Sequence, residues 1–140
     1  MKNLLFTLAL LVMAVSAFAQ TQLADEWPAM TKARNADNNG WLQTHTTPNM
    51  TFIAGNDGSL QNKDWMMGLF KNQKSHKVDF ANVKIQQVGD LGVATGISTI
   101  VIETLDGKKQ SYKDAFTYTL RWYDGKWMFT NFHHTKIEYK

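Results

Sequence analysis

The spacing of apolar residues predicts helices in the first half of the chain. From Leu23 to about His45, large apolar side chains recur at helical intervals, and Arg34 lies in the same stripe. The polar run at 37–40, Asp-Asn-Asn-Gly, interrupts this pattern. We therefore predict one long helix, a break, and a short second helix that Pro48 closes.

A third helix is predicted further along. Residues 50–54 are strand-like, and Asn-Asp-Gly at 56–58 is typical of a turn. The segment from Asn62 to about Asn72 then has an apolar stripe at helical spacing, formed by Trp65, Met66, Leu69 and Phe70.

After Ser75 the apolar residues alternate with a period of two, which predicts strands. Four long segments, 78–88, 93–102, 112–123 and 126–137, are separated by the turn dipeptides Gly-Asp, Asp-Gly and Asp-Gly. Strands joined by tight turns form an antiparallel meander, and helices that precede it can cover one face. The expected fold class is α+β, with the N-terminal helices packed on the concave face of a curved antiparallel sheet.

The N-terminus has the pattern of an export signal. Lys2 precedes an uncharged apolar run at 4–17, and Ala-Phe-Ala at 17–19 places small residues where a signal peptidase acts. The run is shorter than the roughly 20 residues that span a bilayer. We predict a signal peptide at 1–19, a single domain at 20–140, no membrane attachment after cleavage, and a periplasmic or secreted product.

Composition excludes several partners and chemistries. A chain of 140 residues with 44% hydrophobic content supports one domain with a real core. After cleavage it keeps 14 basic and 12 acidic residues, so its charge favours no nucleic-acid partner. It has no cysteine, which excludes disulfides, thiolate metal sites and a lipoprotein anchor. No HExxH, nucleotide-binding glycine pattern or GxSxG occurs, and we predict no metal and no cofactor.

The register of the last hairpin decides which side chains face inward. A three-residue loop at 123–125 would pair Asp114 with His134 and put His133 on the other face, because neighbours along a strand alternate. Two adjacent histidines that point in opposite directions cannot hold one metal together. A two-residue loop would instead pair 118 with 131 and change these assignments.

The order of elements resembles a known superfamily. GDLGVATG opens one predicted strand and YDGKWMFTNFHHT forms the last hairpin. Together with the helices, these motifs resemble the nuclear transport factor 2-like superfamily, in particular small exported SnoaL-like domains and the association domain of calmodulin-dependent kinase. The resemblance implies a cone-shaped, cystatin-like roll and favours the three-residue loop. It identifies function poorly, because the fold hosts isomerases, dehydratases, cyclases and binding or assembly modules.

The candidate ligand pocket joins an aromatic cone to a few polar groups. Its predicted residues are Trp41, Ser98, Phe116, Tyr118, Phe132 and His134. The resemblance places Tyr118 and Ser98 where the kinase association domain has basic pocket residues, which disfavours a carboxylate ligand. Asp37 has two interpretations: the cavity-facing base of ketosteroid isomerase relatives, or a helix cap.

Two functions follow, and a homodimer is predicted alongside either of them. The preferred one is an exported domain that binds a small, mostly neutral hydrophobic molecule. The alternative is an isomerase, dehydratase or cyclase in which His134 shuttles a proton. Asp114 would assist His134, and Tyr118 would donate a hydrogen bond to the developing oxyanion. The dimer would form through the exposed sheet face, with Arg121, Trp127 and Phe129 in contact.

Overall fold

The computed structural model describes residues 21–54 and 57–139, with side chains as far as Ile137. The predicted signal peptide, residues 1–19, lies outside the described residues, as does Asn56 of the predicted turn. Within the described part of the chain, no helix is long and apolar enough to cross a membrane.

Within the described residues, three helices form where the sequence predicts them. They are α2 (Leu23–Ala36), α3 (Asn38–His45) and α4 (Lys63–Lys71). Asp37 is extended and separates α2 from α3, and its Oδ1 accepts a hydrogen bond of 3.0 Å from the backbone N–H of Gly40. Asp37 therefore caps α3, which confirms the second of its two interpretations.

Six strands form one sheet in the order β2-β1-β6-β5-β4-β3. Their bounds are β1 (Thr46–Ile53), β2 (Leu60–Asn62), β3 (Gln73–Val88), β4 (Leu91–Thr104), β5 (Lys109–Tyr123) and β6 (Lys126–Tyr139). β3 to β6 form the predicted meander, but β1 pairs with β6 in parallel, so the sheet is mixed. The sequence missed β2, and Pro48 lies within β1 rather than at the end of a helix.

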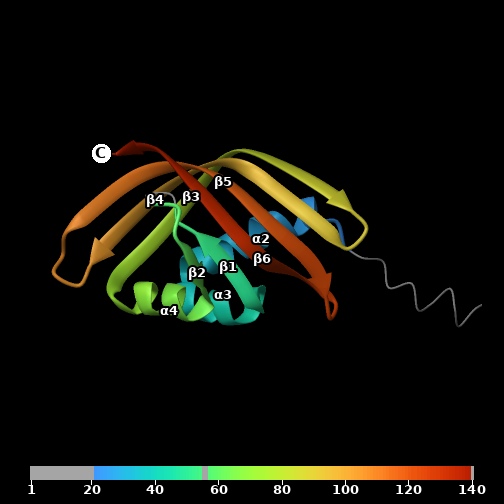
Figure 1. Cartoon of the computed structure of the whole chain (residues 1–140), viewed down its shortest axis with the longest axis horizontal. Coiled ribbons are helices and arrows are strands. Elements are labelled where there is room, and N and C mark those ends of the chain that lie inside the picture. The colour runs from blue at the N-terminus through green and yellow to red at the C-terminus, as the bar shows by residue number, and fades with distance from the viewer. Residues whose placement is uncertain (1–20, 55–56, 140) are drawn as a thin grey trace, which may run out of the picture.

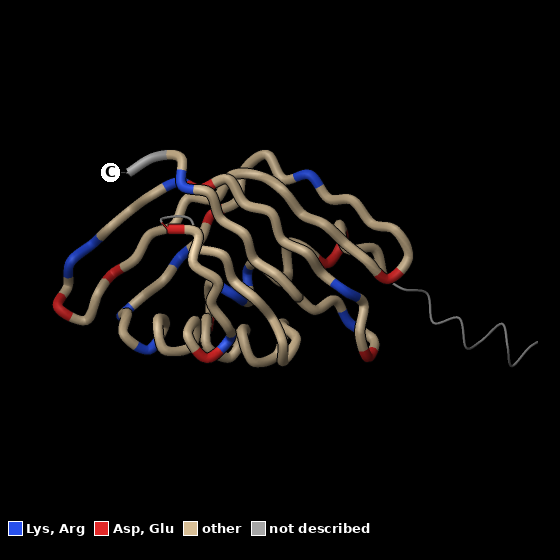
Figure 2. The backbone as a smooth tube through the Cα atoms, viewed as in Figure 1, with Lys and Arg blue, Asp and Glu red and all other residues tan. Residues whose placement is uncertain are grey.

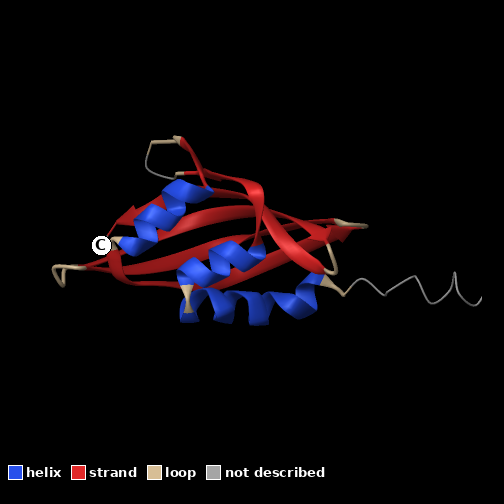
Figure 3. Cartoon of the chain, turned by 90° about the horizontal axis from the view of Figure 1, so that it is seen from below, coloured by secondary structure: helices blue, strands red, loops and turns tan. Residues whose placement is uncertain are grey.

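The sheet arches over the three helices, which lie on its concave side (Figures 1 and 3). The core is the space between them. The buried stripe of α2, formed by Leu23, Trp27, Met30 and Arg34, packs against the inner face of the strands. For example, the Trp27 and Phe116 rings stack with centroids 6.1 Å apart. The α+β class and the helices on the concave face are confirmed.

The register of the last hairpin differs from the predicted one. Tyr123 pairs with Lys126, so the loop has two residues, and both Asp124 (φ 50°) and Gly125 (φ 77°) have positive φ. This conformation is the type I′ turn, whose twist matches that of two antiparallel strands. The extra residue that the resemblance implied is present, but it lies at Thr130, where a bulge shifts the register between Leu120–Phe129 and Thr119–Asn131.

The bulge explains which predictions fail and which survive. Between the turn and Thr130 the facing is the opposite of the predicted one, so Trp127 and Phe129 are buried in the core at 1% exposure each. The predicted dimer contacts of these two residues are therefore wrong. Beyond the bulge the facing returns, and Phe116 pairs with His134. His134 is buried and His133 is exposed, as the alternation predicts.

Candidate functional site

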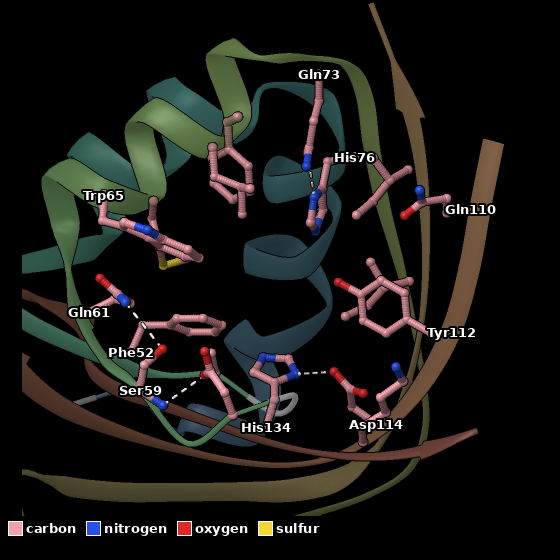
Figure 4. Close-up of a pocket in the computed structure, with 18 of the residues that line it drawn as sticks. Phe52, Ser59, Gln61, Trp65, Gln73, His76, Gln110, Tyr112, Asp114 and His134 are labelled. Carbon is pink, nitrogen blue, oxygen red and sulfur yellow. Dashed lines mark hydrogen bonds and ion pairs between the residues drawn. The ribbon is translucent and has the colours of Figure 1, made fainter. Parts of the chain in front are cut away.

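A cavity of about 530 Å³ opens beneath the end of the arch where β4 joins β5 (Figure 4). Side chains from every strand and from α2 and α4 line it, and Figure 4 shows most of the residues that matter pointing into one space. The volume lies within the range of small-molecule sites, about 300–1,000 Å³. The cavity is therefore large enough for a small organic ligand.

Aromatic and aliphatic side chains form most of the wall. Phe52 of β1 and Trp65 of α4 stack with centroids 5.6 Å apart, and Trp65 keeps 40% of its surface exposed. Ile100 and Ile102 of β4 and Tyr112 of β5 lie on the sheet side. This lining would bury the apolar body of a ligand.

A hydrogen-bonded chain of four side chains runs along the inner wall. Asp114 Oδ2 accepts from His134 Nδ1 at 3.0 Å, His134 Nε2 and Tyr118 Oη are 2.9 Å apart, and Arg34 Nη1 donates to Tyr118 Oη at 3.4 Å. Because the Asp114 carboxylate can only accept, the Nδ1 atom of His134 carries the proton, and Nε2 accepts from the Tyr118 hydroxyl. Both ring nitrogens of His134 are thus occupied.

Burial keeps the imidazoles of the wall neutral. Desolvation lowers the pKa of His134, and the positive charge of Arg34 acts in the same direction, although the hydrogen bond to Asp114 opposes both. Desolvation, followed by the positive charge of Arg34 and that of His134 when it is protonated, lowers the pKa of His76 to about 3. Desolvation also raises the pKa of the fully buried Tyr118 phenol. At neutral pH these three groups carry no charge.

Three buried polar atoms of the wall have no hydrogen-bond partner among the residues that the structure describes: Arg34 Nε, His76 Nε2 and Asp114 Oδ1. His76 Nδ1 lies 2.9 Å from Gln73 Oε1, so Nδ1 donates and Nε2 is left as an acceptor. Arg34 forms no ion pair with any carboxylate in the part of the chain that the structure describes. Arg34, His76 and Asp114 also line the cavity, so their unpaired atoms, rather than those of His134, are the candidates for hydrogen bonds to a ligand.

Only two of the predicted site residues, Asp114 and His134, line the cavity. The structure places the others in the packed core next to it: Trp41, Ser98, Phe116, Tyr118 and Phe132, each at most 3% exposed. Tyr118 still reaches the site through His134. The remaining core residues have no atom at the cavity wall, so their role in ligand contact stays a prediction.

Arg34 and His76 are the important residues that sequence reasoning missed. A signal was present for each. Arg34 is a charged residue within the apolar stripe of α2, and His76 precedes Val78 and Phe80 at alternate, inward-facing positions of β3. The resemblance to the kinase association domain implied that this pocket lacks a cationic group, because Tyr118 stands where that domain has a basic residue. The structure brings a guanidinium to the Tyr118 hydroxyl from α2 instead.

Comparisons with known proteins identify the architecture. No protein-family model matches the chain, and no curated protein matches its sequence. Among solved structures, an NTF2-like protein of unknown function in nutrient uptake from Rhodospirillum rubrum has a TM-score of 0.72 at 16% identity, covering 84% of this chain and all (100%) of that one. The fold is nuclear transport factor 2-like.

Two further structural neighbours differ in described role. A putative calcium/calmodulin-dependent protein kinase II association domain from Xanthomonas campestris matches with a TM-score of 0.66 at 16% identity, over 82% of this chain and 85% of that one. A putative scytalone dehydratase from Novosphingobium aromaticivorans matches with a TM-score of 0.69 at 9% identity, over 84% and 83%. At these identities the likeness shows the fold and not the activity.

Proposed function

We propose that this protein is a small-molecule-binding domain and that the cavity is its binding site. The observation that carries the proposal is the combination of a 530 Å³ space, an aromatic wall, and unpaired polar atoms on buried wall residues. A buried polar atom without a partner costs about 1–3 kcal/mol, and a ligand that bonds to it recovers that cost. The fold fits binding or catalysis alike.

The geometry modifies the ligand that the sequence predicted. The aromatic cone around Phe116, Tyr118 and Phe132 is filled by its own side chains, with Tyr118 and Phe132 ring centroids 4.8 Å apart. The ligand space lies beside this cluster, against Phe52 and Trp65. The body of the ligand is still apolar, but the unpaired atoms Arg34 Nε and Asp114 Oδ1 favour polar groups on it as well.

The proposal is tested by blocking the cavity. Ile100→Trp would obstruct it, whereas Val101→Trp places the same side chain on the opposite face of β4, where Val101 is 37% exposed. Calorimetric titration with indole as a probe should show binding to the wild type and the Val101 variant and none to the Ile100 variant. Equal binding to all three, or binding to none, would contradict the proposal.

Catalysis is the second candidate, and the Asp114–His134 pair favours it. A carboxylate that orients an imidazole is a common arrangement for proton transfer. Both nitrogens of this imidazole are already bonded, however, so His134 could exchange a proton with a ligand only if the Tyr118 hydroxyl moved away. If the domain is an enzyme, His134→Gln should abolish turnover of a candidate substrate while the substrate still binds. If the domain only binds, the wild type itself should show no turnover.

Export is part of the proposal. The N-terminal pattern at 1–19 supports a cleaved signal peptide and a periplasmic or secreted domain. The mass of the protein recovered from a cell that exports it should correspond to a chain beginning at Gln20. A mass that retains the first 19 residues, in a cytoplasmic fraction, would contradict this part of the proposal.

We also propose a homodimer through the convex face of the sheet. The middle stretches of β4 and β5 carry no charge there: Val93, Thr95 and Ile97 lie beside Thr119, Thr117 and Ala115. Figure 2 shows the charged positions concentrated towards strand ends and turns. A neutral, half-buried face of this kind suits a second copy of the chain.

A further inference from the structure

Two cationic and two acidic side chains line the cavity. Arg34 and Asp114 lie deep in the wall, at 3% and 4% exposure, and Lys136 and Asp57 lie nearer the surface. Two cationic and two acidic groups balance one another overall. A ligand with a single charge would satisfy one of the deep groups and leave the other buried without compensation, which is costly.

The two deep charges do not neutralise each other directly. Arg34 comes from α2 and Asp114 from β5, and the side chains of Tyr118 and His134 separate them in the hydrogen-bonded chain. Because burial lowers the pKa of His134, its bond to Asp114 joins a carboxylate to a neutral ring and does not cancel the charge. The guanidinium lies 5.4 Å from the centroid of the Trp41 ring but pairs with no carboxylate among the described residues, and the Asp114 carboxylate pairs with no cation there.

The unpaired atoms have the same polarity as these charges. Arg34 Nε is a donor, while Asp114 Oδ1 and His76 Nε2 are acceptors. The complementary ligand therefore presents acceptors to Arg34 and donors to Asp114 and His76. A carboxylate supplies the first and an ammonium, with its three N–H donors, supplies the second.

Resting on the proposed function, we infer that the cavity takes a zwitterionic, amine-bearing carboxylic acid with an aromatic or aliphatic body. Its carboxylate pairs with Arg34, its ammonium pairs with Asp114 and bonds to His76, and its body lies against Phe52 and Trp65. His134 is a positioning residue that holds the Asp114 carboxylate, and both of its ring nitrogens are already bonded, so it offers the ligand no hydrogen bond.

The test compares zwitterions with molecules that lack one charge, using the mature wild-type chain and calorimetric titration. The zwitterions are L-phenylalanine and 4-amino-5-phenylpentanoate, which differ in the spacing of their charges. The matched probes are 3-phenylpropanoate, without the amine, and 2-phenylethylamine, without the acid. Ethylbenzene, with neither charge, tests the cavity alone. At least one zwitterion should bind tenfold or more tightly than each singly charged probe.

Variants assign the two charges. Asp114→Asn keeps an acceptor for His134 Nδ1 but removes the negative charge, so the advantage of the zwitterion over 3-phenylpropanoate should disappear. Arg34→Gln should remove its advantage over 2-phenylethylamine. Lys84→Gln, an exposed change on β3 away from the cavity, should alter neither ratio. The wild-type comparison stands alone if either buried variant fails to fold.

The outcomes separate the two proposals. Singly charged probes that bind as tightly as both zwitterions, or ethylbenzene binding alone, would overturn the zwitterion inference and leave the binding function intact. If ethylbenzene and every other probe fail to bind, the binding function itself is contradicted. Zwitterion selectivity that survives Asp114→Asn in a folded variant would overturn the assignment of the ammonium.

Discussion

At the scale of single residues, the wall of the cavity is a set of polar groups that the fold buries and does not fully pair. His76 illustrates the physical consequence. Its ring lies edge-on to Phe70, with centroids 4.9 Å apart, and is 5% exposed, so a charge on it would have no water to stabilise it. The protein therefore keeps this histidine neutral over most of the acidic range.

The pH dependence of stability follows from that burial. The pKa of His76 is about 3 in the folded protein against an ordinary value of 6.5, so between these values only the unfolded chain takes up the proton. The contribution of the neutral His76 ring to the free energy of unfolding is complete above pH 6.5 and is lost as the pH falls towards 3. From about pH 8 to about pH 5 the loss is about 2 kcal/mol. Urea unfolding at several pH values measures it.

His76→Gln is the matched comparison, because glutamine keeps an acceptor but cannot titrate. The variant should lose less stability on acidification than the wild type, by about the same 2 kcal/mol. His134, whose pKa is also lowered by burial, contributes in the same direction in both proteins. Parallel pH profiles for wild type and variant would show that His76 titrates normally.

The sequence predicts such residues only in part. Period-two alternation correctly separates His134 from His133, because that rule is local. It does not reveal that the Tyr118 hydroxyl donates to His134 Nε2, or that Arg34, 84 positions away along the chain, donates to the Tyr118 hydroxyl. Which buried atoms stay unpaired depends on contacts between elements, and no spacing rule reports those contacts.

At the scale of elements, the exposed edge of β3 is protected by a side chain of α2. Asn35 acts as a surrogate strand: its Nδ2 donates to the Val78 carbonyl at 2.8 Å, and its Oδ1 accepts from the Val78 N–H at 2.9 Å. Asn38 Nδ2 donates to the His76 carbonyl in the same way. These bonds fix α2 and α3 to the strand that carries His76, and they occupy edge groups that could recruit another strand.

Asn35→Ala should therefore destabilise the protein and free the edge of β3. Loss of the two bonds should lower the free energy of unfolding by about 1–2 kcal/mol in urea. Amide hydrogen exchange should accelerate at Val78, because its N–H has no other partner. Asn49→Ala, an exposed change on β1, should alter neither quantity. Unchanged exchange at Val78 would refute this function of Asn35.

The bulge at Thr130 takes the place of the third loop residue that was predicted for the last hairpin. Thr130 is held by hydrogen bonds from its hydroxyl to the Thr119 carbonyl, at 3.1 Å, and between the two hydroxyls, at 2.9 Å. The resemblance favoured an extra residue within the turn, and that prediction of a three-residue loop is wrong. Asp124-Gly125 forms a complete two-residue turn, so the extra residue had to lie within the strand.

Trp127→Ala distinguishes the two registers. In the observed register Trp127 is buried and donates from Nε1 to the Thr21 carbonyl at 2.9 Å, so truncation should cost about 3–5 kcal/mol. Tyr123→Ala, at an aromatic residue 62% exposed on the same hairpin, should cost about 0.5 kcal/mol or less. Urea unfolding measures both. Equal, small costs would favour the three-residue loop that the sequence predicted.

At the scale of the whole molecule, the arch has two faces of different character. Its concave face is covered by helices and contains the cavity. Its convex face is open and, over the middle of β4 and β5, free of charge. The sequence predicted this division because apolar residues alternate along each strand. It placed Trp127 and Phe129 on the wrong face, so the aromatic contacts expected of a dimer are replaced by threonine, valine and isoleucine side chains.

If two copies meet through this face, one lysine at its centre should separate them. Thr117 lies between Thr95 of β4 and His133 of β6, so Thr117→Lys would bury an uncompensated charge in the dimer while leaving the monomer solvated. A cost of about 3 kcal/mol corresponds to a roughly 100-fold weaker association.

Light scattering across a concentration series should then report a dimer for the wild type and a monomer for the variant. Gln43→Lys adds the same charge at an exposed position of α3, on the concave side of the sheet, and should leave the dimer intact. A wild type that is monomeric at high micromolar concentration would remove the dimer, and because the cavity is lined entirely by one chain, the binding proposal would stand without it.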